Sequence, residues 1–149
     1  MRDDFERAIA FVIKHEGGYV NNPNYTGGET NYGISKRAYP AQDIKNLTEA
    51  DAKAIYKKDY WEKCDCDALP WPMNLAVLDA AVNCGPRRAM NWLHISTDWL
   101  DYINHRRDFY KALNKPVFLK GWINRLSDLE RVALRVVDAP DDADEAKCR

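Results

Sequence analysis

Glu16 is the residue whose type and position most clearly suggest chemistry. It takes the next place on an apolar stripe at helical spacing, formed by Phe5, Ala8, Ile9, Val12 and Ile13. Partial burial and the negative end of the helix dipole both disfavour a charged carboxyl there. Both effects raise its pKa, as a general acid near neutral pH requires. The alternative is an exposed Glu at a frayed helix end.

The segment after Glu16 has the composition of a ligand-binding hairpin. It contains five of the seven glycines in the chain, at positions 17, 18, 27, 28 and 33, which indicates special backbone angles or close approach of a ligand. Tyr19, Tyr25, Tyr32 and Thr30 project from it, between turns rich in asparagine. Sugar rings stack on aromatic side chains and bond to hydroxyls and amides. We therefore expect a small irregular β-hairpin beside the acid and a saccharide cleft, the alternative being a glycine-rich surface loop.

The elements that must position these residues are mostly helices. Apolar periodicity and capping signals predict helices near residues 5–16, 48–61, 75–82, 86–93, 99–113 and 122–136. The fold class expected is mainly α, with one small β-hairpin after the first helix.

Composition and charge exclude several classes of protein. The 149 residues carry a net charge of −1, which argues against a nucleic-acid binder that works by bulk charge. No apolar run is long enough to span a bilayer, and no signal-like segment opens the chain, so we expect cytoplasmic synthesis without a signal peptide and no membrane insertion. The cysteines are expected to be free thiols, with no metal or cofactor. Two pairs of adjacent arginines are expected on solvated faces: Arg87, Arg88, Arg106 and Arg107.

Four stretches resemble glycoside hydrolase family 108. They are His15–Asn21 (HEGGYVN), Gly27–Ser35 (GGETNYGIS), Asp79–Ala89 (DAAVNCGPRRA) and Phe118–Arg125 (FLKGWINR). The resemblance implies a lysozyme-like helical fold and an N-acetylmuramidase, many relatives being phage endolysins. It also implies that Glu16 is the catalytic acid, acting on the β-1,4 bond between N-acetylmuramic acid and N-acetylglucosamine. Residues 1–139 would form one catalytic domain, in which roughly 100–137 resemble the family's predicted peptidoglycan-binding block, and residues 140–149 a flexible acidic tail.

One position departs from the phage-lysozyme pattern. Tyr25 stands where relatives often carry an acidic residue, and a neutral phenol is a poor base. Our hypothesis is that Glu16 protonates the leaving oxygen while Thr30 and Tyr25 position the attacking water, with inversion and with Glu29 as a reserve base.

Other residues are expected to hold the substrate. The substrate-binding candidates are Tyr19, Glu29, Tyr32 and Asn83, and four further aromatic residues are candidates for the saccharide groove: Tyr60, Trp61, Trp71 and Trp122.

Two other functions remain open. A lytic transglycosylase also needs a single Glu and no second carboxylate, which fits the departure at Tyr25. A non-catalytic wall-binding or lysis accessory protein would fit a loss of activity. In each case the expected partner is bacterial peptidoglycan and the expected state a monomer. The protein would act on the periplasmic cell wall, after a holin-type release from the cytoplasm.

Overall fold

The computed structural model describes residues 3–24 and 26–138. In that part of the chain the elements are α1 (Asp4–Glu16), β1 (Thr30–Asn31), β2 (Ile34–Ser35), α2 (Glu49–Tyr56), the π-helical turn η1 (Lys57–Glu62), the 3₁₀ turn η2 (Cys66–Ala68), α3 (Met73–Cys84), α4 (Pro86–Ile95), α5 (Trp99–Ala112) and α6 (Pro116–Asp138). The prediction of a mainly α fold with one small hairpin is confirmed. The predicted acidic tail, residues 140–149, lies outside the described residues.

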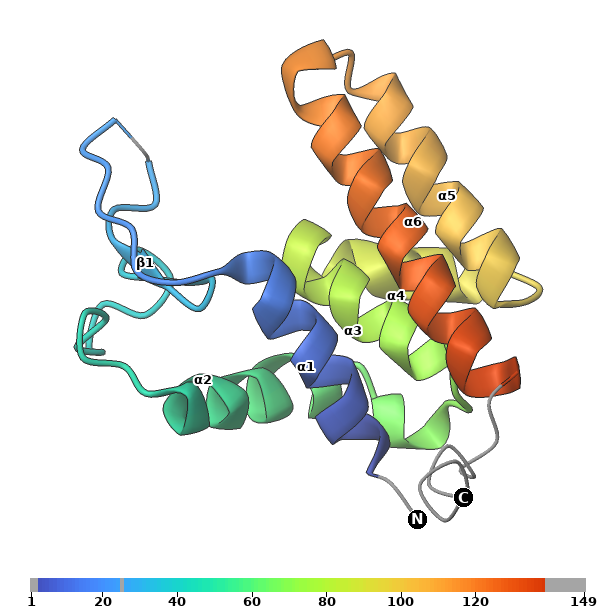
Figure 1. Cartoon of the computed structure of the whole chain (residues 1–149), viewed down its shortest axis with the longest axis horizontal. Helices are drawn as coiled ribbons and strands as arrows, with labels where there is room; N and C mark the ends of the chain where they lie inside the picture. The colour runs from blue at the N-terminus through green and yellow to red at the C-terminus, as the bar shows by residue number, and fades with distance from the viewer. Residues whose placement is uncertain (1–2, 25, 139–149) are drawn as a thin grey trace, which may run out of the picture.

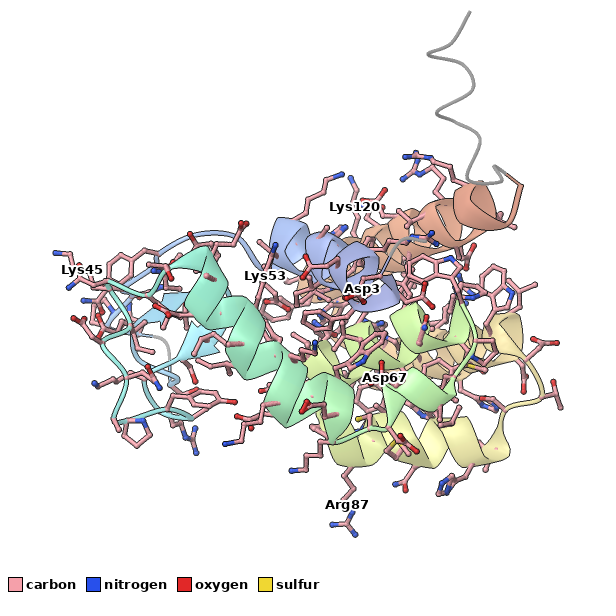
Figure 2. The ribbon with its side chains drawn as sticks, turned by 90° about the horizontal axis from the view of Figure 1, so that it is seen from below. Asp3, Lys45, Lys53, Asp67, Arg87 and Lys120 are labelled. Atoms are coloured by element: carbon pink, nitrogen blue, oxygen red, sulfur yellow. The ribbon has the colours of Figure 1, made fainter. Side chains whose placement is uncertain are left out.

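The elements form two parts that meet at α1. The hairpin and α2 lie on one side of α1, and α3 to α6 lie on the other (Figure 1). Helices α5 and α6 run side by side, and their connected ends project away from the other helices (Figure 1). Figure 2 shows α2 passing from the hairpin toward α3, with the exposed Arg87 pointing into solvent as expected. No helix of the described residues is long and apolar enough to cross a membrane.

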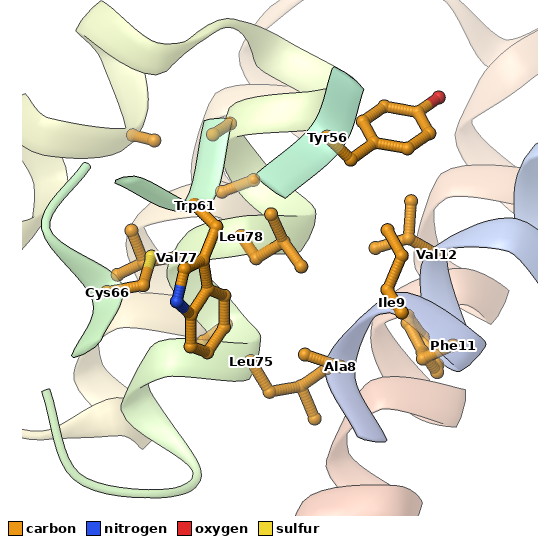
Figure 3. Close-up of a cluster of buried hydrophobic side chains, with 14 of the residues drawn as sticks. Ala8, Ile9, Phe11, Val12, Tyr56, Trp61, Cys66, Leu75, Val77 and Leu78 are labelled. Carbon is orange, nitrogen blue, oxygen red and sulfur yellow. The ribbon is translucent and has the colours of Figure 1, made fainter. Parts of the chain in front are cut away.

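The core is built where α1 packs on α3. Ala8, Ile9 and Val12 of α1 are fully buried, as are Leu75 and Leu78 of α3 (Figure 3). The apolar stripe read from the sequence is therefore the buried face of α1. Because this packing holds α1 along its length, the position of Glu16 at its last residue is well defined.

The hairpin is small and tied down by one buried side chain. Strands β1 and β2 are antiparallel, pairing Thr30 with Ser35 and Asn31 with Ile34. The two residues between them, Tyr32 and Gly33, have φ of +53° and +81°, as a tight hairpin turn requires. The Asn31 amide donates to the carbonyl of Ile44 at 3.0 Å, so it anchors the hairpin to the loop before α2.

Two helix boundaries differ from the prediction. The capping box of Thr48 and Asp51 is present, but the regular helix ends at Tyr56 and continues as the π-helical turn η1. Helix α6 begins at Pro116, whose ring suits the first turn of a helix, rather than near residue 122. Apolar periodicity locates the buried part of a helix but not its exposed first turn.

Candidate active site

Glu16 is the last residue of α1, as its place on the apolar stripe predicted. Gly17 ends the helix with φ +81°, and its N–H donates to the Ile13 carbonyl at 3.1 Å. The Glu16 side chain is 20% exposed, so the carboxyl is largely withdrawn from water but still reachable.

An open cavity of about 270 Å³ lies beside this carboxyl. It is lined by Glu16, Val20, Asn22, Thr30 and Gly33. Val20 and Thr30 exchange two backbone hydrogen bonds of 2.8 Å, which hold the hairpin over α1. Thr30 thereby shares one cavity with Glu16, as the sequence hypothesis required.

Gly33 is packed so closely that no side chain fits there. A Cβ atom on Gly33 would lie 2.6 Å from the Tyr56 hydroxyl and 2.9 Å from both Cβ and Cγ of Glu16. The Tyr56 hydroxyl donates to the Tyr32 carbonyl at 2.6 Å, so three elements converge on this glycine. Its close approach lets the hairpin backbone rest directly on the acid.

A buried ion network from three helices stands behind Glu16. Arg125 of α6 donates to a Glu16 carboxylate oxygen at 3.1 Å and to Asp79 of α3 at 2.6 Å. Arg106 of α5 donates to the other oxygen of Asp79 at 2.7 Å. Asp79 and Arg106 are both almost completely buried. Arg125 is thus held by Asp79 in the orientation that reaches Glu16.

Burial sets the direction in which the pKa of Glu16 is shifted. It raises the pKa of the carboxyl above its ordinary value, and the nearby charge of Asp79 adds to this effect. The charge and hydrogen bond of Arg125 lower the pKa but do not overcome burial. Arg125 donates one hydrogen bond to Glu16 and the other three to Asp79. Burial alone would also raise the pKa of Asp79, but Arg125 and Arg106 lower it to about 2. The geometry therefore raises the pKa of one carboxyl and lowers the pKa of the other.

The other hairpin candidates lie near Glu16 in different ways. The Tyr19 hydroxyl donates to Glu29 at 2.6 Å, and this exposed pair lies outside the set of residues lining the Glu16 cavity. Tyr32 contributes its backbone carbonyl to Tyr56. Tyr25 lies outside the described residues.

Asn83 lies in a second place, at the end of α3. Its side-chain oxygen accepts a hydrogen bond from the Tyr110 hydroxyl, which in turn accepts one from Arg106 at 2.8 Å. Asn83 also lines a cavity of about 240 Å³ with Tyr110 and Trp122, whose rings stack at 4.9 Å. Hydrogen bonds and ion pairs therefore connect Asn83 to Glu16 through the buried network.

One expectation from the sequence is wrong, and two of the four groove candidates lie away from the cleft. Arg106 is 1% exposed and not on a solvated face, because it pairs with Asp79. Trp61 is 1% exposed and packs on Phe5 in the core. Trp71 lies under Arg7, near the first turn of α1. At 1.5 Å per residue, that end of the helix is roughly 15 Å from Glu16.

Sequence reasoning missed the roles of Asp79, Arg125 and Tyr56 in this site. Asp79 carried a usable signal, since it is a lone charge inside an otherwise apolar helix, and such a charge must be paired. No signal in the sequence identified its partners, because Arg106 and Arg125 are distant from Asp79 in the sequence.

A mainly α domain that places an acid of raised pKa on an open cleft beside a small hairpin has the features of a glycoside hydrolase. The chain belongs to glycosyl hydrolase family 108: the family model described as Glycosyl hydrolase 108 matches residues 9–85. The fold is similar to a solved structure described as that of Brucella abortus SagA, with 30% identity and a TM-score of 0.74. The match covers 87% of this chain and 93% of that one. Among curated proteins no match is found.

Proposed function

We propose that this glycoside hydrolase is an N-acetylmuramidase of bacterial peptidoglycan, with Glu16 as the general acid. The observation that carries the proposal is the Glu16 carboxyl itself. It is mostly buried, its pKa is raised, and it lies on the wall of an open cavity that it shares with Thr30. Family membership supplies the substrate class.

In the proposed reaction, Glu16 donates its proton to the glycosidic oxygen as the bond from that oxygen to C1 of N-acetylmuramic acid breaks. Water adds to C1 from the opposite face and inverts the anomeric configuration, and its proton passes to a base, for which Glu29 is the candidate. Thr30 and Tyr25 position this water. Once Glu16 has lost its proton, Arg125 at 3.1 Å stabilises the carboxylate.

The acid is tested by Glu16→Gln, with Glu49→Gln, at an exposed position outside the cavity lining, as the matched control. Lysis of outer-membrane-permeabilised cells, followed by turbidity, should fall by at least about a hundredfold for Glu16→Gln, the usual loss for a general acid. The control should lyse cells like the wild type. Wild-type lysis by Glu16→Gln refutes the assignment.

Two further outcomes bear on the reaction. Absence of lysis by the wild-type chain would favour a non-catalytic wall-binding role. In NMR of the first product, an α-anomer supports inversion and a retained β-anomer excludes it.

A lytic transglycosylase is the second candidate. Among the described residues that line the cavity, Glu16 is the single carboxylate, and a transglycosylase needs no second one. Its products end in 1,6-anhydro sugars, which are lighter by one water. Mass spectrometry of the products distinguishes the two reactions, and we expect the hydrolysed form.

The biological setting is also part of the proposal. We place the protein as a monomeric phage endolysin that reaches the wall after holin-type release. Residues 1–139 would act as one catalytic domain, with the segment 100–137 contributing wall binding.

A further inference from the structure

A cavity of about 510 Å³ lies between the hairpin side of the molecule and the π-helical turn η1. Tyr39, which follows the hairpin, forms one wall. Lys58, Tyr60 and Lys63 of the η1 region form another, and Pro86 at the start of α4 closes the end. Its volume falls in the range of about 300–1,000 Å³ that is common for ligand sites. The sequence had marked Tyr60 as a groove candidate, and this is where its ring lies.

The cavity is physically connected to the acid. The Tyr60 ring lies 5.3 Å from the Tyr56 ring. The Tyr56 hydroxyl in turn lies against Gly33, and Gly33 also lies against the Glu16 side chain. Burial raises the pKa of Tyr60, and the negative charge of Glu16 raises it further, which places the two groups within electrostatic range. Tyr56 itself is 1% exposed, so a branch of a polymer held at Glu16 would reach Tyr60 over the surface above the Tyr56 ring.

The lining combines aromatic rings with exposed positive charge. Tyr39 and Tyr60 are half-buried and rigidly placed, and the Tyr39 hydroxyl donates to Asp59 at 2.8 Å. Among the described lining residues Asp59 is the one acidic side chain, and that bond occupies it. Lys58 and Lys63 are exposed at the rim. A widened π-helical turn is often found at functional sites, and here it spaces these side chains around the opening.

We propose that this cavity binds the anionic peptide that peptidoglycan carries on the lactyl group of muramic acid, with Lys58 and Lys63 contacting its carboxylates and Tyr60 its apolar stem. The inference rests on the proposed function, because it assumes that the glycan strand lies across Glu16. It assigns the cavity a different ligand from the saccharide cleft, since an uncharged sugar can form no ion pair with two ammonium groups.

The test measures binding, so that it does not depend on catalysis. The Glu16→Gln protein is titrated calorimetrically with glycan fragments of several disaccharides, either bearing their peptides or stripped of them by an amidase. The same titrations are made with Lys58→Ala/Lys63→Ala added. The control is Lys45→Ala/Lys53→Ala, which removes the same charge at two positions that line neither this cavity nor the Glu16 cavity (Figure 2).

The expected result is selective weakening. Removing both lysines should weaken the binding of peptide-bearing fragments about five- to tenfold, as expected for two exposed charge contacts. The affinity for stripped fragments should stay unchanged. The control should change neither. The inference is overturned if the affinity for both kinds of fragment falls equally, or if the affinity for neither kind falls. Failure of the wild-type chain to cleave either fragment would instead refute the proposed function, because binding is measured separately.

Discussion

Substitution of Gly33 by alanine tests the contact between the hairpin and the acid. The new Cβ would lie 2.6 Å from the Tyr56 hydroxyl and 2.9 Å from two Glu16 carbons, at a residue with φ +81°. Left-handed backbone costs a non-glycine residue about 1–2 kcal/mol, and overpacking about 1–3 kcal/mol more. We therefore expect a loss of about 2–5 kcal/mol, or a fall in Tm of about 4–20 °C for a chain of this size.

The activity of Gly33→Ala should fall more than its stability suggests. The Glu16 atoms involved are Cβ and Cγ, so the carboxyl moves when they yield. A displacement near 1 Å at a reacting group costs about a hundredfold in rate. Cell-wall lysis at a temperature where the variant remains folded by circular dichroism measures this loss.

The matched control is Gly28→Ala. Gly28 has a similar φ of +75°, but the atom nearest to an added Cβ there is Lys36 Cβ at 3.8 Å, an ordinary contact. The Gly28→Ala variant should lose only the stability that the left-handed backbone costs, and it should keep its activity. Equal effects of the two substitutions would refute the proposed close contact.

A double variant sharpens the result. Tyr56→Phe removes the atom nearest to the new Cβ and loses one buried hydrogen bond, a change of about 1 kcal/mol. Combined with Gly33→Ala, it should destabilise less than the sum of the two single changes. Strict additivity would mean that the alanine does not meet the Tyr56 hydroxyl.

Three further predictions concern the groups around the site. Asp79→Asn should lower the free energy of unfolding by about 3–5 kcal/mol in urea, because it removes the carboxylate that pairs with the buried Arg106 and leaves Arg125 paired with Glu16 alone; a loss below about 1 kcal/mol contradicts this. Because the pKa of Asp79 is lowered from 3.8 to about 2, its stabilisation is present above a pH of 3.8 and lost as the pH falls toward 2, and the variant should lack that acid-side slope. The pKa of Glu16 is raised, so its stabilising protonated form is lost as pH rises; Glu16→Gln should therefore keep or raise Tm at mildly alkaline pH while losing activity, and a Tm drop refutes the sign. Asn31→Ala removes the buried amide that donates to the Ile44 carbonyl, which keeps its bond from the Leu47 N–H, and should cost about 1 kcal/mol in thermal unfolding, whereas a neutral result would show that the hairpin does not depend on this anchor.

Much of the fold follows from patterns within single segments. The period of the apolar residues located α1 and its buried face, and a Thr-Asp capping box marked the start of α2. The π-helical turn after Tyr56 escaped prediction, because its extra residue per turn is stabilised by long-range packing of Trp61 and not by local sequence.

The place of the acid at a helix end, and the glycine-rich hairpin after it, could be predicted from the sequence alone. An apolar stripe that ends in Glu16 and is followed by glycine is a local pattern. Such a pattern can be recognised within one segment, without knowing how the rest of the chain folds. Tertiary structure alone decided how that acid is tuned. Arg125 reaches Glu16 across 109 positions of sequence, and Asp79 holds Arg125 only because α3, α5 and α6 converge. Such contacts depend on how helices pack. The periodicity of a helix predicts which face is buried, but not which distant residue will pair with a buried charge.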